Sequence, residues 1–393
     1  MKNLVPKRRF EEFKDSDPWE QRKLGELAQY RRGSFPQPYG KEEWYNGDGA
    51  MPFVQVVDVT DSLALAENTK QKISRIAQPK SIFVPKGKVI VTLQGSIGRI
   101  AITQYDCFVD RTLLIFESYN RAIDVVFWAY TMQMKFDIEK EKAPGGTIKT
   151  ITKEALTDFV ISLPKYKEQQ RIGTFLSNLD NLITLHQRKL DKLKETKSAY
   201  LSEMFPKEGE LYPKRRFAGF TDPWEQRKLG ELTNIKTGSS DLQDAVDNGE
   251  YPFFVRSENV ERSNRYIFDG EAILIPGEGR LGDIYHYING KFDYHQRVYK
   301  ISDFADSNTD GKFVLYYLQQ NFKRHALKFT VKATVDSLRL PMLVDFEIKL
   351  PNIDEQREVG VFFSNLDNLI TLHQRKLDKL QALKQAYLSE MFV

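Results

Sequence analysis

The chain has 393 residues, of which 41% are apolar and 28% charged, a composition typical of a folded globular protein and one that excludes a disordered chain. The net charge of +4 is too small to identify a partner, and the single cysteine, Cys107, excludes an internal disulfide framework and a multi-cysteine metal site. No apolar run approaches the ~20 residues of a membrane span and no apolar signal region follows Met1, so we expect a cytoplasmic protein.

The first predicted element is a short basic and aromatic lead that occurs twice. Residues 6–10 read Pro-Lys-Arg-Arg-Phe, and the same letters stand at residues 213–217. A second repeated block follows, because residues 17–27 return letter for letter at residues 222–232. We expect this block to be a turn that opens one turn of helix. The chain therefore consists of two copies of one unit.

Each copy continues into a long and diverged body, at residues 28–163 and 233–350. Both bodies begin with β-branched and aromatic runs broken by glycine, which predict strands. The segment 277–282 matches the G-x-G-x-x-G pattern of dinucleotide-binding loops, but the residues after it alternate like a strand and open no helix. We therefore predict tight hairpin turns there and at the matching segment 93–98. Each body also has one predicted helix, at about residues 124–140 and 312–327.

Each copy ends in a long helix with a regular apolar pattern. Residues 175–205 and 362–392 align without a gap at a shift of 187, and 26 of the 31 positions are identical. Apolar residues recur at a 4-3 spacing, which predicts a coiled coil. Since the other copy is the nearest partner, and a two-fold axis across the seam reverses one helix, we expect an antiparallel pair. The central seam residues are Leu179, Ile183, His186 and Leu190 in the first copy and Leu366, Ile370, His373 and Leu377 in the second.

Two histidines stand in this apolar seam. A polar seam residue can fix the register of a coiled coil at some cost in stability. If the helices pair centre to centre, heptad counting places His186 opposite Leu377 and His373 opposite Leu190. We interpret both histidines as structural residues and not as ligands or catalytic groups.

Motifs of nucleotide-using or metal-dependent catalysis are missing from the sequence. It has no G-x-x-x-x-G-K-[ST] loop, and its five histidines and one cysteine supply no metal-ligand spacing. The Asp-Pro-Trp triplets at residues 17–19 and 222–224 lack the second proline of an amino-methyltransferase site, and no glycine-rich cofactor motif precedes them. No convincing nuclease cluster of carboxylates and lysine is present. We therefore predict that the chain is not an enzyme.

Loops that combine glycine with basic or amide side chains recur at matched places in both bodies. Arginine can bond the edge of guanine, glutamine can bond adenine, and Lys, Ser, Thr and backbone N–H groups hold phosphates. These loops therefore favour double-stranded DNA as a partner. The candidate DNA-binding residues are Arg31, Arg32, Ser34, Ser96, Arg99, Arg111 and Lys149 in the first body and Lys236, Thr237, Arg280, Gln296, Arg297, Lys332 and Thr334 in the second.

The layout resembles the specificity subunit of Type I restriction–modification enzymes, the HsdS family. The resemblance covers the whole chain. It rests on the repeated lead and Asp-Pro-Trp-Glu-Gln-Arg-Lys-Leu-Gly-Glu-Leu block and on the Glu-Gln pairs at residues 168–169 and 355–356. The repeated Leu-Asp-Asn-Leu-Ile-Thr-Leu-His-Gln-Arg-Lys-Leu helix and residues 269–279 also match the family.

The resemblance implies an α+β protein in which two pseudo-repeated target recognition domains are joined by two long helices that form an antiparallel coiled coil. Each domain would read one half of an asymmetric, bipartite DNA site, and the stiff helices would set the gap. The implied domains are recognition domains at 1–163 and 207–350 and spacer helices at 164–206 and 351–393.

The resemblance also implies partner subunits. Two modification (methyltransferase, HsdM) subunits would dock on the helices, and restriction (HsdR) subunits would join them. S-adenosylmethionine, ATP and Mg²⁺ would belong to those partners, which methylate adenine or restrict the DNA. This chain would bind no cofactor, no metal and no membrane.

Two other functions stay open. An enzyme that acts on nucleic acid by itself would methylate or cleave DNA as the purified chain, and the missing motifs disfavour it. A coiled-coil scaffold that binds only protein would show no sequence preference and no steep salt dependence of DNA binding, whereas several phosphate contacts give a steep dependence.

Overall fold

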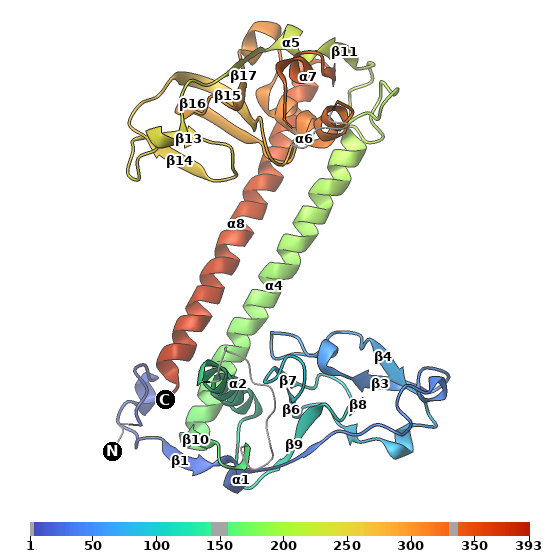
Figure 1. Cartoon of the computed structure of the whole chain (residues 1–393), viewed down its shortest axis with the longest axis vertical. Helices are drawn as coiled ribbons and strands as arrows, with labels where there is room; N and C mark the ends of the chain where they lie inside the picture. Colours follow the sequence, from blue (N-terminus) through green and yellow to red (C-terminus); the bar gives the residue numbers. More distant parts are fainter. Residues whose placement is uncertain (1–3, 143–155, 330–336) are drawn as a thin grey trace. The chain divides into compact units, whose positions relative to one another are not determined.

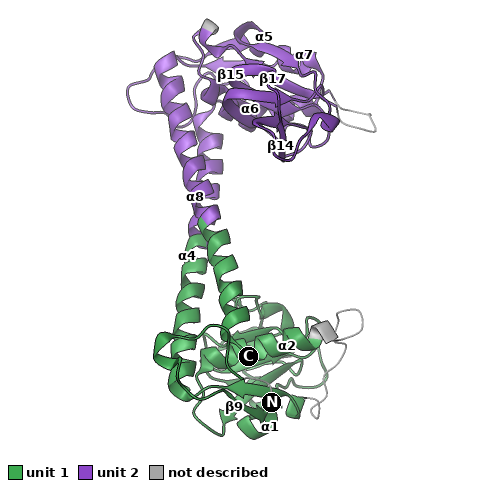
Figure 2. Ribbon diagram, turned by 90° about the vertical axis from the view of Figure 1, so that its left-hand side faces the viewer, with its two compact units in different colours: residues 1–186, 376–393 green, residues 187–375 purple. Residues whose placement is uncertain are grey.

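The protein folds into two compact units, shown in separate colours in Figure 2. Unit 1 contains residues 1–186 and 376–393, and unit 2 contains residues 187–375. Unit 1 is therefore built from both ends of the sequence. Among the described residues, no helix combines the length and the apolar composition needed to cross a bilayer. The structure, a computed structural model, describes residues 4–142, 156–329 and 337–393.

Two four-stranded sheets form the body of unit 1 (Figure 1). The first has the strand order β2-β9-β6-β7, with antiparallel neighbours throughout. The second has the order β4-β3-β8-β5, in which β3 and β8 are parallel. The strands are β1 (Glu20–Lys23), β2 (Ala28–Arg32), β3 (Met51–Val54), β4 (Gln71–Ile73), β5 (Phe83–Val84), β6 (Val89–Thr92), β7 (Ile100–Ile102), β8 (Cys107–Val109), β9 (Leu113–Tyr119) and β10 (Val160–Leu163). The helices are α1 (Leu24–Leu27), α2 (Val125–Lys142), the first part of α4 (Tyr166–Met204) and the last part of α8 (Ile353–Met391).

Helix α2 packs beside the first sheet and confirms the helix predicted at residues 124–140. Phe127, Trp128 and Phe136 are fully buried along it. The ring of Trp128 meets that of Phe116 on β9 edge-on, with 5.4 Å between ring centres. Asp124 caps the helix by accepting a hydrogen bond from the N–H of Phe127 at 2.9 Å.

Unit 2 has a related arrangement, with one six-stranded sheet in place of the two four-stranded sheets. Its main sheet has the order β12-β17-β15-β16-β13-β14, and α6 packs beside β15. Asp310 accepts from the N–H of Phe313 at 2.8 Å, as Asp124 does in unit 1, and α6 confirms the helix predicted at residues 312–327. The strands are β11 (Glu225–Lys228), β12 (Asn234–Thr237), β13 (Tyr251–Phe254), β14 (Val260–Ser263), β15 (Phe268–Pro276), β16 (His286–Tyr294), β17 (Val298–Ser302) and β18 (Glu347–Leu350). The helices are the rest of α4, α5 (Leu229–Leu232), α6 (Gly311–Leu327), α7 (Leu340–Val344) and the first part of α8 (Ile353–Met391).

The repeated block at residues 17–27 contains a strand as well as a helical turn. The predicted helical turn is α1, but the four residues before it form β1, which pairs antiparallel with β10. The second block repeats this pairing between β11 and β18. The sequence Glu-Gln-Arg-Lys is polar throughout and has no alternation, so its pattern does not predict a strand. Backbone pairing holds it at the surface.

The glycine-rich segments 277–282 and 93–98 lie in loops between antiparallel strands, as predicted. The first lies between β15 and β16 and the second between β6 and β7. Gly282 and Gly98 have φ values of 70° and 82°, in the left-handed region that favours glycine. A strand follows each segment where a dinucleotide-binding loop would be followed by a helix. Both segments therefore lie in hairpin connections as predicted, but the loops, at residues 93–99 and 277–285, are longer than tight turns.

The two long helices run antiparallel within unit 1. The rings of Phe175 on α4 and Tyr387 on α8 are 4.7 Å apart. Farther along α4, Oδ1 of Asp180 lies 2.6 Å from Nζ of Lys384, which stands earlier in α8. Residue numbers therefore rise along one helix as they fall along the other.

Unit 2 contains the same antiparallel pairing. The ring centres of Tyr200 on α4 and Phe362 on α8 are 5.1 Å apart, and Nζ of Lys197 lies 2.7 Å from Oδ1 of Asp367. All eight predicted central seam residues are buried or partly buried. The predicted α+β fold with an antiparallel coiled coil is therefore confirmed.

The two seam histidines differ in burial. The side chain of His186 is buried and that of His373 is partly buried, while Leu190 and Leu377 are both buried. The register of the contacts in each unit agrees with an arrangement in which each histidine faces a leucine. The pairs His186–Leu377 and His373–Leu190 stay a prediction.

Candidate nucleic-acid interface

The ends of four strands meet at one edge of the first sheet in unit 1. Because β2, β9, β6 and β7 are antiparallel neighbours, the end of β2, the start of β9, the end of β6 and the start of β7 lie along the same edge. We call this edge the unit 1 edge. It brings together the described candidates of the first body, which are Arg31, Arg32, Ser34, Ser96, Arg99 and Arg111.

Backbone hydrogen bonds hold the loops of the unit 1 edge against one another. The N–H of Ser34 donates to the carbonyl of Val109 at 3.0 Å, and the N–H of Leu93 donates to the carbonyl of Thr112 at 2.8 Å. Gly33 permits the first approach, because a Cβ on it would lie 2.2 Å from the oxygen of Val109. Glycine is therefore required where the loop after β2 crosses the end of β8.

Unit 2 has the same arrangement, which we call the unit 2 edge. The end of β12, the start of β17, the end of β15 and the start of β16 lie along it. A Cβ on Gly238 would lie 1.9 Å from the oxygen of Tyr294, and the N–H of Gln296 donates to the carbonyl of Ser240 at 2.9 Å. This edge brings together Lys236, Thr237, Arg280, Gln296 and Arg297.

Three candidates, Lys149, Lys332 and Thr334, lie outside the residues that the structure describes. In the described part of the chain, no cluster of three His, Cys, Asp or Glu side chains has the arrangement of a metal site. Cys107 is fully buried on β8, and burial raises the pKa of its thiol to about 12. The thiol is therefore protonated, and Cys107 is a small side chain of the core.

Exposed carboxylates pair with two arginines of the unit 1 edge. Nε of Arg31 lies 2.6 Å from Oε1 of Glu117, and Nε of Arg99 lies 3.1 Å from Oδ1 of Asp61. All four side chains are more than a third exposed, so water screens both pairs and each contributes little to stability. A phosphate can therefore displace either carboxylate at small cost.

Other basic side chains of the two edges have no carboxylate to displace. In the ranges that the structure describes, Arg32 and Lys236 form no ion pair, and both are exposed. The guanidinium of Arg111 lies over the ring of Tyr39, 5.4 Å from its centre. These groups are suited to contact an anion directly.

Glu278 organises the arginines of the unit 2 edge. Arg256 donates to its carboxylate at 3.0 Å, and Arg297 donates to the other oxygen. Both hydrogen bonds lower the pKa of Glu278, and the bond from Arg256 has the larger effect. The carboxylate is therefore ionised at neutral pH. Arg280 pairs separately with Glu258. The edge thus presents both arginine donors and a carboxylate acceptor, the group types that read base edges.

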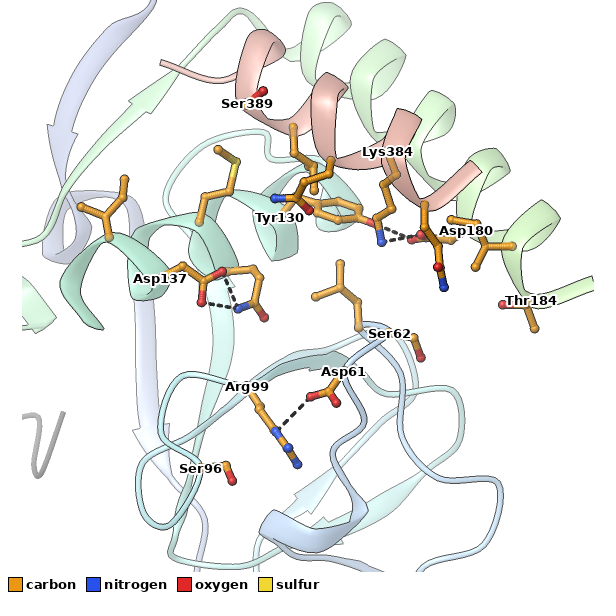
Figure 3. Close-up of a pocket in the computed structure, with 18 of the residues that line it drawn as sticks. Asp61, Ser62, Ser96, Arg99, Tyr130, Asp137, Asp180, Thr184, Lys384 and Ser389 are labelled. Carbon is orange, nitrogen blue, oxygen red and sulfur yellow. Dashed lines mark hydrogen bonds and ion pairs between the residues drawn. The ribbon is translucent and has the colours of Figure 1, made fainter. Parts of the chain in front are cut away.

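A groove of ≈ 1110 Å³ lies beside the unit 1 edge (Figure 3). One wall consists of the β6–β7 loop with Ser96 and Arg99, together with Asp61. The opposite wall consists of α2, α4 and α8 and includes Tyr130 and Ile183. Two candidate DNA-binding residues and one predicted seam residue therefore line the same groove.

A buried ion pair, not predicted from the sequence, joins each repeated lead to the start of a long helix. Nε and Nη2 of Arg9 each donate to a carboxylate oxygen of Glu168 at 2.7 Å. Arg216 and Glu355 form the same bidentate pair in unit 2, at 2.7 and 2.6 Å. In both units, the second arginine of the repeated lead thus bonds the Glu of the repeated Glu-Gln motif.

We call α2 and α6, the helices of the two diverged bodies, the body helices. The glutamine of the Glu-Gln motif holds the start of the body helix in each unit. Nε2 of Gln169 donates to the carbonyl of Pro164 at 2.9 Å, and its Oε1 accepts from the N–H of Asp124 at 3.1 Å. Gln356 makes the equivalent two bonds in unit 2. The repeated motifs thus form the scaffold that holds each diverged body on the long helices.

The fold and the two edges define a duplicated α+β binding protein, in which two copies share a scaffold and differ in the surfaces that they present. The family model of the Type I restriction modification DNA specificity domain matches residues 16–195 and 221–382. These matches include most of the chain, which belongs to this family. It is a DNA specificity subunit and not the enzyme of such a system.

Individual relatives agree with this assignment. The chain is 22% identical to the Type I restriction enzyme MjaVIII specificity subunit of Methanocaldococcus jannaschii, over 94% of this chain and 91% of that one. It is 30% identical to the EcoDI specificity subunit of Escherichia coli over 41% of this chain and 34% of that one. The crystal structure of a Type I restriction–modification S subunit from M. genitalium has the same fold, with a TM-score of 0.73, 15% identity and 99% of each chain covered.

Proposed function

We propose that the chain reads an asymmetric, bipartite DNA site through its two diverged bodies. Residues 1–163 and 207–350 act as target recognition domains, and residues 164–206 and 351–393 act as the spacer that fixes the gap. The observation that carries this proposal is the convergence, in each unit, of basic and other polar side chains at the same edge of the main sheet. Two edges of one plan with different side chains suit two different half-sites.

The chemistry of the edges supports DNA as the partner. Arg32 and Lys236 suit phosphates, because no carboxylate competes for them in the described residues. Gln296 and Arg297 suit base edges, because an amide can bond adenine and a guanidinium can bond guanine through two bonds. We extend the proposal to the other candidates named from the sequence.

Removing basic side chains from one edge is expected to affect one half of the site. Arg32→Ala with Arg111→Ala should change the preference for one half, and Lys236→Ala with Arg297→Ala that for the other. A lost bidentate base contact reduces discrimination by roughly 5- to 150-fold, whereas a lost phosphate contact weakens all sequences and lowers the salt slope by about 1. Sequencing of fragments that the full-length chain binds from a random DNA library measures each preference.

Arg121→Ala is the matched control for these variants. Arg121 lies beyond the opposite end of β9 and pairs with Glu20 at 2.8 Å, so its loss is expected to leave both halves unchanged. A continuous symmetric site would contradict the two-reader proposal. Binding without sequence preference or steep salt dependence would favour the scaffold function instead.

We also propose that identical apolar surfaces on the long helices dock two modification subunits. Leu182 and Leu185 of α4 are 46% and 47% exposed, and their counterparts Leu369 and Leu372 of α8 are 44% and 59% exposed. A surface that is the same in both copies suits two copies of one partner. Restriction subunits join this cytoplasmic complex, and the partners use S-adenosylmethionine, ATP and Mg²⁺ to methylate a flipped adenine or to restrict the DNA.

Polar substitutions on these surfaces are expected to remove modification subunits from the complex. Leu182→Ser with Leu185→Ser should release one of the two, and all four substitutions should release both. The mass of the assembled complex, measured by light scattering after gel filtration, checks this. Leu383→Ser is the control, since Leu383 is also exposed but Thr196 stands at its counterpart. Retention of both subunits by the fourfold variant would refute the docking proposal.

A further inference from the structure

Side chains from three helices meet at one point in unit 1 (Figure 3). The hydroxyl of Tyr130 on α2 donates to Oδ2 of Asp180 on α4. Nζ of Lys384 on α8 lies 2.6 Å from Oδ1 of the same carboxylate and 5.0 Å from the centre of the Tyr130 ring. One carboxylate therefore receives a bond from the body helix and another from the second long helix.

Unit 2 contains the same cluster, with the roles of the two long helices exchanged. The hydroxyl of Tyr316 on α6 donates to Oδ2 of Asp367 on α8 at 2.8 Å. Nζ of Lys197 on α4 lies 2.7 Å from Oδ1 of that carboxylate and 5.1 Å from the centre of the Tyr316 ring. We call each set a domain clamp, formed by Tyr130, Asp180 and Lys384 in unit 1 and by Tyr316, Asp367 and Lys197 in unit 2.

The lysines of the domain clamps stand where a coiled coil normally has apolar side chains. Lys197 and Lys384 occupy heptad seam positions, and their side chains are only 17% and 20% exposed. An apolar residue would pack there without the cost of removing an ammonium group from water. A polar group at such a position supplies directional bonds, and directional bonds fix one geometry among several that apolar packing would allow.

The tyrosines supply the directional bond on the side of the recognition domain. Both tyrosines lie on a body helix, and both of their side chains are buried. Burial, with the adjacent carboxylate, raises the pKa of Tyr130 and of Tyr316, so each hydroxyl keeps its proton and stays a donor. The buried hydroxyl therefore bonds to the carboxylate in only one orientation of the body helix.

A short series of contacts connects each domain clamp to a recognition loop. In unit 1, Tyr130 and Phe136 lie on the same helix, and a Cβ on Gly98 of the β6–β7 loop would lie 2.9 Å from the Cβ of Phe136. In unit 2, a Cβ on Gly282 of the β15–β16 loop would lie 2.9 Å from the Cα of Lys323 on α6. The body helix thus lies directly against the loop that contains candidate DNA-binding residues, and a tilt of the helix moves the loop.

We propose that the domain clamps are positioning residues that fix each recognition domain on the long helices and thereby set how strictly the gap between the two DNA half-sites is measured. The inference rests on the bipartite reading proposed above. Neighbouring gap lengths differ by one base pair, about 3.4 Å along the duplex. A displacement of a recognition loop on that scale is enough to admit the next gap length.

The test is a selection from DNA libraries whose gap length is randomised. The full-length wild-type chain should select two half-sites at one gap length. Lys384→Met and Tyr130→Phe in unit 1, and Lys197→Met and Tyr316→Phe in unit 2, should select the same half-site bases and admit neighbouring gaps. We expect the preference for the native gap to fall by roughly 10- to 100-fold, equivalent to one lost charge-assisted hydrogen bond.

Two controls separate positioning from a purely structural role. Leu190→Ala removes a buried seam side chain outside the clamps, and it should lower the melting temperature while leaving the gap preference intact. Lys384→Arg keeps a cation beside Asp180 and leaves the acceptor of the Tyr130 hydroxyl in place, so it should retain the strict gap that Lys384→Met loses. Lys192→Met changes an exposed lysine of α4 and should have no effect.

The outcomes are distinct. A broadened gap with unchanged half-sites in the clamp variants, together with a strict gap in Lys384→Arg, supports the proposal. An unchanged gap in all four clamp variants refutes it, as does an equal loss of affinity at every gap length or the same broadening in Leu190→Ala. If the wild-type chain selects no two-part site, the bipartite function itself fails, whatever the clamp variants do.

Discussion

Replacing Arg9 with methionine is expected to lower the free energy of unfolding of unit 1 by about 3–5 kcal/mol. The guanidinium of Arg9 bonds both oxygens of Glu168 and also the carbonyls of Ser16 and Asp17, at 2.8 and 3.1 Å. The side chain of Glu168 is only 2% exposed, so the loss of its partner leaves an uncompensated charge in the interior. Hydrogen–deuterium exchange of the unit 1 amides measures the loss, and exchange in unit 2 is expected to stay unchanged.

The double variant Arg9→Met with Glu168→Met is expected to recover most of this loss, because it removes both charges and leaves apolar side chains of similar volume. Arg8→Met is the matched control, since Arg8 forms an exposed pair with Glu390, and it should change stability little. If Arg9→Met were no more harmful than Arg8→Met, the buried pair would not hold the lead on the helix.

Phe205→Ala is expected to lower the free energy of unfolding of unit 2 by about 3–5 kcal/mol. The ring of Phe205 is 3% exposed and lies just after the end of α4. Its centre is 5.5 Å from those of Phe313 and Tyr317 on α6, and 5.8 Å from that of Phe363 on α8, against which it stacks. Truncation leaves a cavity where the body helix and both long helices meet. Faster hydrogen exchange along α6 is the expected result.

Phe392→Ala tests the same contact in the other copy. Phe392 stacks on Phe127 at 5.3 Å and meets Trp19 at 6.0 Å, so the faster exchange should now appear in unit 1. Phe205→Leu should cost less than Phe205→Ala because it leaves a smaller cavity. Tyr212→Ala removes an exposed ring and should have no effect. If either alanine substitution increased the rate of hydrogen exchange equally in both units, the two aromatic clusters would not act separately.

Repetition made much of the fold predictable. The 4-3 spacing predicts the helices because a seam needs one apolar side chain every three or four residues, and the structure confirms both helices within a few residues of the predicted bounds. Both body helices and both hairpin loops follow from equally local patterns. The described candidate recognition residues lie together at the ends of adjacent strands. Their loops are distant in the sequence, so no local pattern predicted that they would be close in space.

Interactions between distant segments were not predictable in the same way. The pair Arg9–Glu168 joins residues far apart in the sequence, and neither neighbourhood has a periodic pattern. The strand β1 forms because β10 supplies backbone partners, which its polar sequence does not reveal. A lysine at a seam position, Lys197 or Lys384, was the one local sign of the domain clamps, but its carboxylate partner lies on another helix.

Unit 1 contains the last residues of the chain as well as the first, and this fixes the order in which the two units are completed on the ribosome. All residues of unit 2 have been synthesised by position 375, whereas unit 1 still requires residues 376–393. The ring contacts of Phe392 with Trp19 and Phe127 therefore form only after the whole of unit 2 has been translated. The usual order, in which the N-terminal domain is complete first, is reversed in this chain.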